Sequence, residues 1–93
     1  MVTAVILLCI ERSRIKEVAE ELAGMEGVSE VYSVAGNVDL IAIVRVPRFE
    51  DIADVIAGRI SKTPGVLNTE SHIAFRAYSK HDLEAAFSLG MDG

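Results

Sequence analysis

Two long apolar runs, residues 2–10 and 40–46, constrain the fold more than any other feature of this sequence. A strand with one face in water alternates apolar and polar residues, whereas these runs are apolar at almost every position. Strands of this kind must be covered on both faces. The 93 residues offer only two substantial helical segments, which can hardly cover both faces of a sheet. A second copy of the protein is the expected cover, so the sequence predicts an obligate oligomer.

The two halves of the chain repeat one another. A shift of 38 positions matches strand, helix and turn residues of one half to those of the other. Two strand-helix-strand units in one sheet give an α+β fold, the ferredoxin-like β-α-β-β-α-β sandwich, with both helices on one side. The matched positions are Val5 with Ile43, Val18 with Ile56, Ala19 with Ala57, Leu22 with Ile60, and Gly27-Val28 with Gly65-Val66.

The apolar runs are expected at the centre of the sheet, with the more polar residues 28–34 and 68–77 at its edges. Ser13 is the predicted N-cap of the first helix. The fourth strand is expected to run from Val66 to about Tyr78. Helical spacing predicts inward faces made of Ile15, Val18, Ala19 and Leu22 in the first helix and of Phe49, Ile52, Ile56 and Ile60 in the second.

We expect one domain over residues 1–78, with residues 79–93 as its C-terminal helical tail. Residues 80–89 are typical of a short third helix with an apolar stripe of Leu83, Ala86 and Phe87. The stripe alone leaves open whether this helix docks on its own chain or on a neighbour.

Composition excludes several classes of protein. The net charge of −5 and the scattered basic residues argue against direct binding of nucleic acid. The opening run has no basic residue before it and no cleavage site after it, and it is too short to span a bilayer. A single cysteine, Cys9, forms no internal disulfide, so a cytoplasmic location is expected.

Catalytic and metal-binding signatures are absent from the sequence. His72 and His81 do not have the spacing of a zinc pair, and Cys9 in a central strand is expected to be inert. There is no Ser-His-Asp pattern and no phosphate loop. The sequence therefore predicts no enzyme, no metal and no cofactor.

Two segments, residues 34–44 and 64–73, carry a resemblance to a known family. They are similar to the effector domain of the Lrp/AsnC-type regulators, called RAM for regulation of amino-acid metabolism. The most specific pieces are a Gly-x-x-Asp hairpin at Gly36 and Asp39 and a Gly-Val entry at Gly65 into a Thr-containing strand. The resemblance covers roughly residues 2–78.

The resemblance implies an assembly and a role. Full-length members place a helix-turn-helix domain ahead of this module, so the chain resembles a stand-alone RAM protein. In such relatives two chains pack sheet against sheet, in the manner of a dimeric α/β barrel. Dimers assemble further into octamer-like rings, with amino-acid effectors at the contacts between dimers. A full-length regulator of the family is the further partner that the resemblance implies.

An amino-acid zwitterion needs an acceptor for its ammonium and donors for its carboxylate. Asp39 can be the acceptor, while the backbone N–H groups of Gly36, Asn37 and Val38 can bind the carboxylate. Thr69 and Ser71, two apart, share a strand face and could converge with the hairpin. The family usually has Thr where Ser71 stands. In the alternative interpretation, Gly36 and Asn37 only serve the turn and Asp39 caps it.

Two functions remain in competition. The first is an amino-acid-binding module of transcriptional regulation without its own DNA-binding domain. The second is a small dimeric α/β-barrel enzyme, such as a cofactor-free monooxygenase or an isomerase, because the same architecture hosts both. The inner strand positions offer mostly Val, Ile, Leu and Ala, which weakens the catalytic alternative. A structural interaction protein without a ligand is a third possibility.

Overall fold

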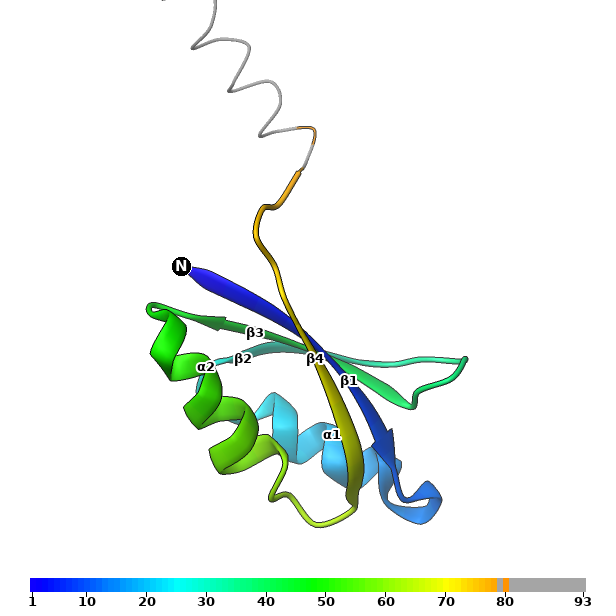
Figure 1. The fold of residues 1–93 in the computed structure, drawn as a ribbon. Helices are drawn as coiled ribbons and strands as arrows, with labels where there is room; N and C mark the ends of the chain where they lie inside the picture. Colours follow the sequence, from blue (N-terminus) through cyan, green and yellow to red (C-terminus); the bar gives the residue numbers. More distant parts are fainter. Residues whose placement is uncertain (79, 81–93) are drawn as a thin grey trace, which may run out of the picture.

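The computed structural model describes residues 1–78 and residue 80 (Figure 1). The described chain follows the predicted β-α-β-β-α-β order. A 3-10 turn, Arg12–Arg14, precedes the first helix, and a π-helical turn, Ile56–Ile60, extends the second. The strands and α-helices are β1 (Val2–Ile10), α1 (Ile15–Ala23), β2 (Val28–Ser33), β3 (Leu40–Val46), α2 (Phe49–Val55) and β4 (Val66–Ile73).

The four strands form one antiparallel sheet in the order β2-β3-β1-β4. The two apolar runs are therefore the central strands, as predicted, and both helices lie on one side of the sheet (Figure 1). On that side Ile6, Leu8 and Leu40 are fully buried against Val18 and Leu22 of α1. Burial of this apolar layer is the main stabilising term of the fold.

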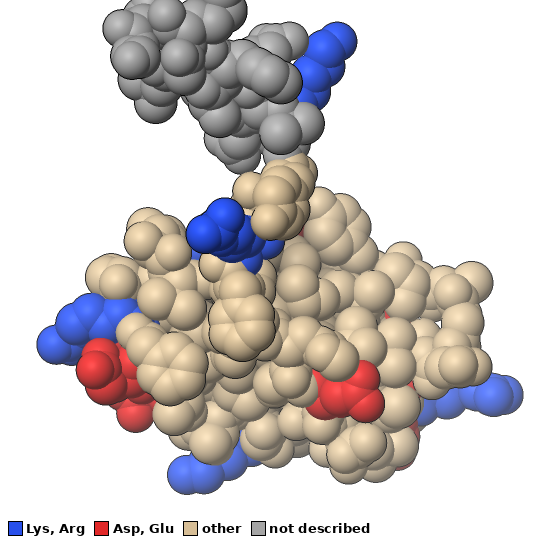
Figure 2. Space-filling view, turned by 45° about the horizontal axis from the view of Figure 1, so that its top comes forward, with Lys and Arg blue, Asp and Glu red and all other residues tan. Residues whose placement is uncertain are grey.

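The side of the sheet away from the helices is here called the open face. Its central positions, Val5, Leu7, Ile41 and Ile43, are only half-buried in the single chain. Figure 2 brings this side forward obliquely, and most of the visible surface is uncharged, with charged side chains in a few separate places. Strand alternation and register assign the open face to Thr3, Val5, Leu7 and Cys9 of β1, Glu30 and Tyr32 of β2, Ile41, Ile43 and Arg45 of β3, and Asn68, Glu70 and His72 of β4.

Gly27 and Gly65 occupy equivalent positions in the repeat, and each allows a helix to pack closely against the start of a strand, β2 after Gly27 and β4 after Gly65. Both have positive φ, 92° and 100°. A Cβ at Gly27 would lie 2.9 Å from a methyl group of Val55 in α2, and one at Gly65 would lie 2.9 Å from a methyl group of Val18 in α1. Each glycine that follows one helix therefore packs against the other helix, which ties the two halves together.

Several local predictions are wrong. Ser13 does not cap α1, because Arg12–Arg14 closes into a 3-10 turn and α1 begins at Ile15 without a side-chain cap. Phe49 is 64% exposed because it is the first residue of α2, and Val55 occupies the core in its place. The π turn, closed by a 2.8 Å bond from Ser61 N to Ile56 O, brings Val55 and Ile60 to the same side.

The edge strands are shorter than expected. β2 ends at Ser33 and β4 at Ile73, although Ala74 N still donates to the carbonyl of Thr3 at 2.9 Å. All four predicted inward positions of α1 are confirmed, as are the other three predicted for the second helix, namely Ile15, Val18, Ala19 and Leu22, and Ile52, Ile56 and Ile60. The predicted third helix, apart from Lys80, lies outside the described residues.

Candidate functional site

The hairpin between β2 and β3 holds four of the six predicted site residues. Gly36 has a φ of 145°, which favours glycine, and a Cβ there would meet nothing within 4 Å. Gly36 and Asn37 are exposed, whereas Val38 and Asp39 are half-buried. Val34 N donates to Asp39 O at 3.1 Å, which closes the hairpin. The turn thus presents its exposed backbone to solvent at one end of the sheet.

Asp39 joins this hairpin to the end of β1. Its Oδ2 accepts a hydrogen bond from the backbone N–H of Ile10 at 2.8 Å, and its own N–H donates to Leu8 O at 2.9 Å. The carboxylate therefore caps the end of β1, a structural role that differs from the turn cap of the alternative interpretation. A carboxylate has about four acceptor positions, so this one bond leaves capacity for a second donor such as an ammonium group.

Thr69 and Ser71 lie together on the other side of β1. They pair with Leu8 and Ile6, so both project to the helix-covered side of the sheet, at its β4 edge. Thr69 is half-buried and Ser71 is exposed. Thr69 also lines a depression of about 180 Å³ with Ser61, Val66, Leu67 and Asn68.

Within one chain the hairpin and the β4 pair do not converge. Leu40, next to Asp39, pairs with Leu8 from one side, while Thr69 pairs with Leu8 from the other. Neighbouring strands are about 4.8 Å apart, which separates these backbones by roughly 10 Å. The hairpin also leans toward the open face, where Asn37 O lies 4.0 Å from the Cys9 Sγ.

Sequence reasoning missed a polar cluster on the open face. Glu30 accepts hydrogen bonds from the Tyr32 hydroxyl and, at 3.0 Å, from Nη1 of Arg45. The bond from Tyr32, followed by that from Arg45, holds the pKa of the Glu30 carboxyl below its ordinary value, and Glu30 in turn raises the pKa of Tyr32. The sequence feature that could have indicated this cluster was Arg45, a charged residue inside the apolar run 40–46.

A second pair lies at the opposite edge of the open face. There His72 Nε2 is 2.7 Å from Oε2 of Glu70. This contact accounts for the exposed histidine, while His81 lies outside the described residues. Across residues 1–78, no group of three or more His, Cys, Asp or Glu side chains is placed to hold a metal ion.

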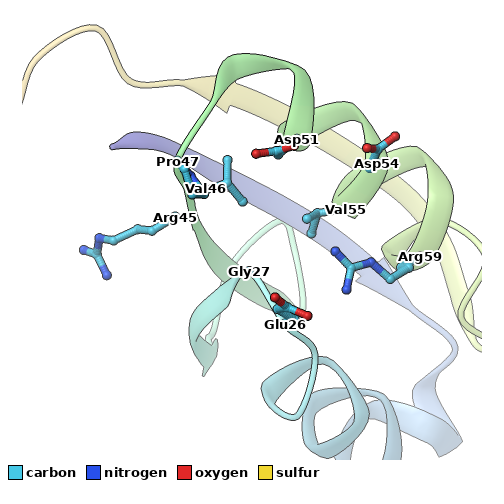
Figure 3. Close-up of a pocket in the computed structure, with 9 residues that line it drawn as sticks. All are labelled: Glu26, Gly27, Arg45, Val46, Pro47, Asp51, Asp54, Val55 and Arg59. Carbon is cyan, nitrogen blue, oxygen red and sulfur yellow. The ribbon is translucent and has the colours of Figure 1, made fainter.

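Sequence reasoning also missed a charged cleft at the end of the sheet opposite the hairpin (Figure 3). Its volume is about 430 Å³, and it lies among the turn before β2, the end of β3 and α2. No local motif marks it, because its walls come from three separate segments. None of the helices in the described part of the chain is long and apolar enough to cross a membrane.

Comparison with known sequences identifies relatives. A family model described as the Lrp/AsnC ligand binding domain matches residues 3–83. The uncharacterized HTH-type transcriptional regulator PF0250 of Pyrococcus furiosus is 35% identical over 60 residues, which are 64% of this chain and 40% of that protein. The chain thus spans less than half the length of that relative.

Solved structures extend the likeness. TTHA0845 from Thermus thermophilus is 40% identical with a TM-score of 0.81, over 86% of this chain and 100% of that chain. Transcriptional regulator NMB0573 from Neisseria meningitidis, solved as a complex with L-Met, shares the fold alone, with 12% identity and a TM-score of 0.69 over 84% of this chain and 52% of that chain. These matches confirm the resemblance drawn from the hairpin and β4 segments. The chain belongs to the Lrp/AsnC ligand-binding domain family.

Proposed function

We propose that this chain is an amino-acid-sensing and oligomerisation module of transcriptional regulation, paired through its open face. The observation that carries the proposal is the apolar centre of that face, which no described residue of the same chain covers. Val5, Leu7, Ile41 and Ile43 are half-buried there. Full burial of one large apolar side chain stabilises by about 1.5–3 kcal/mol, so a second copy packed on this face has a sufficient driving force.

The edges of the open face support the same pairing. The Glu30–Arg45 ion pair lies on the β2 side and the Glu70–His72 pair lies on β4. An apolar centre with a polar rim is the usual anatomy of a protein interface. In a two-fold dimer the same patch serves both copies, which a sheet-to-sheet contact satisfies.

The ligand site is proposed to form between copies. The hairpin and Thr69 lie on opposite sides of β1, so one chain cannot close them around a ligand. The depression beside Thr69, at about 180 Å³, is also smaller than the roughly 300 Å³ at which small-molecule pockets begin. A hairpin from one dimer placed against β4 of another would complete the pocket, and repetition of that contact would close a ring.

An amino acid fits the chemistry of these two parts. Asp39 retains acceptor capacity for an ammonium, and the exposed turn at Gly36 and Asn37 offers backbone donors for a carboxylate. Thr69 and Ser71 add hydroxyl groups from the second copy. NMB0573, a distant protein that shares the fold over 52% of its chain, was solved as a complex with L-Met, which supports an amino acid as the ligand class.

The regulatory part of the proposal follows from the relatives. PF0250 is described as a helix-turn-helix regulator, and this chain matches 40% of it. We propose that the chain acts on such a regulator, either by forming mixed assemblies with it or by competing for its effector.

The core gives the enzymatic alternative no support. A dimeric α/β-barrel enzyme needs a substrate cavity between sheet and helices with polar catalytic groups. Within residues 1–78, the buried side chains are apolar apart from Thr63, whose hydroxyl donates to the Arg59 carbonyl at 3.0 Å. The family and its regulator relatives support a binding role, which we propose in place of catalysis.

Thermal unfolding followed by circular dichroism, in the presence of each of the twenty amino acids, tests the sensing role. A ligand at about 100 times its Kd adds about 2.7 kcal/mol to the stability of the folded state. A selective rise in Tm for one or two amino acids is expected. Asp39→Asn keeps an oxygen for the Ile10 N–H but removes the charge, so it should abolish the rise, while Ser13→Ala should not. No rise with any amino acid would contradict sensing.

A further inference from the structure

The charged cleft described above has the dimensions of a ligand site. Its volume, about 430 Å³, falls inside the range of roughly 300–1,000 Å³ typical of small-molecule pockets. It lies at the opposite end of β2 and β3 from the hairpin, so it is separate from the site proposed between copies. One chain supplies all of its described walls.

Gly27 keeps the floor of the cleft open. Its φ is 92°, and a Cβ there would lie 2.9 Å from Val55 and 3.3 Å from Val46. The same Cβ position is 3.9 Å from Nη2 of Arg59, so the guanidinium lies over the glycine. In Figure 3 this guanidinium projects from the π-helical turn that extends α2 toward the region between Val55 and Glu26. The cleft therefore has an apolar wall at Val46 and Val55, a bare backbone floor at Gly27 and the guanidinium of the exposed Arg59 beside that floor.

Two of the charged side chains that line the cleft are engaged elsewhere. Arg45 donates to Glu30 on the open face at 3.0 Å, and in Figure 3 it points away from the cleft. Asp51 pairs with Arg48 at 3.4 Å. Glu26, Asp54 and Arg59 also line the cleft, and no ion pair involves any of them within the described part of the chain.

The charge of these three side chains indicates the ligand class. The carboxylates of Glu26 and Asp54 can each pair with a cationic group, and the guanidinium of Arg59 can pair with a carboxylate. A ligand with two cationic groups and one carboxylate therefore has the opposite charge at each of the three positions. We infer that the cleft binds a basic amino acid of the lysine type. Its carboxylate meets Arg59, where a guanidinium can bind it in bidentate fashion. Its two ammonium groups meet Glu26 and Asp54.

Isothermal titration calorimetry of the full chain with L-lysine tests this inference. L-norleucine lacks the side-chain ammonium and cadaverine lacks the carboxylate, so each should bind at least about tenfold more weakly than L-lysine. Arg59→Gln should weaken L-lysine about tenfold and leave cadaverine unchanged. Glu26→Gln should weaken both. Arg12→Gln and Glu20→Gln, which remove equivalent charges from exposed positions outside the cleft, should leave all affinities unchanged.

The outcomes separate this cleft from the hairpin site. Asp39→Asn should leave L-lysine binding intact, even if it abolishes the response to another amino acid. Absence of L-lysine binding would overturn the inference. So would binding that survives both Glu26→Gln and Arg59→Gln but is lost in Asp39→Asn, because that ligand would occupy the hairpin site. Circular dichroism of each variant should report an unchanged fold.

Discussion

Truncation of Leu7 to alanine should weaken the proposed dimer without unfolding the chain. Leu7 lies at the centre of the open face, opposite Ile41 of β3, and is half-buried in the single chain. Loss of three carbons at about 0.8 kcal/mol each removes about 2.4 kcal/mol of burial. At least roughly two thirds of that burial already exists in the monomer, which leaves at most about 0.8 kcal/mol per copy for the interface. Because the same residue enters a two-fold contact from both copies, the dimer loses up to about 1.6 kcal/mol.

This loss corresponds to a rise of up to about 15-fold in the dimer Kd. Sedimentation velocity across a dilution series measures the shift, and far-UV circular dichroism checks that the fold is retained. Phe49→Ala is the matched control, because Phe49 is an exposed apolar side chain at the start of α2, outside the open face. A Kd unchanged by Leu7→Ala, or raised equally by Phe49→Ala, would refute an interface centred on the open face.

Three further predictions concern stability. Gly36→Ala, at a φ of 145° in open space, should cost about 1–2 kcal/mol in thermal unfolding, whereas Gly27→Ala should cost more because its Cβ would lie 2.9 Å from Val55. Asp39→Ala, which leaves the Ile10 N–H without its acceptor, should lower the unfolding free energy by about 1–3 kcal/mol in urea, and Asp39→Asn should lower it less. The pKa of Glu30 is lowered, so its contribution is present above the unfolded value of 4.5 and lost as pH falls through the folded value. The unfolding free energies of wild type and Glu30→Gln should therefore begin to converge as pH falls below about 4.5 and should coincide once pH is below the folded pKa of Glu30.

The sheet could be predicted because the residues that form it follow a repeating pattern in the sequence. The two apolar runs mark strands covered on both faces, and the 38-residue repeat fixes their topology. Gly27 and Gly65 recur at equivalent positions because each must approach the opposite helix. The error at Ser13 arises because a 3-10 turn precedes α1, and the error at Phe49 arises because this residue is the first of α2.

The site was less predictable because it depends on distances across the sheet. Residue spacing correctly assigns Thr69 and Ser71 to one strand face, but only the register shows that β1 separates them from the hairpin. The charged cleft combines Glu26 with Arg59, which no periodic pattern connects. Such a site is visible only once the helix packing is known.

Subunit mixing is the most direct test of a ligand site shared between copies. Asp39→Asn damages the hairpin half and Thr69→Val damages the β4 half, so each variant alone should fail to bind the amino acid that stabilises the wild type. If the halves come from different copies, a refolded equimolar mixture should regain about one quarter of the wild-type sites. A mixture that binds no more than the separate variants, or a single variant that binds like wild type, would contradict the account.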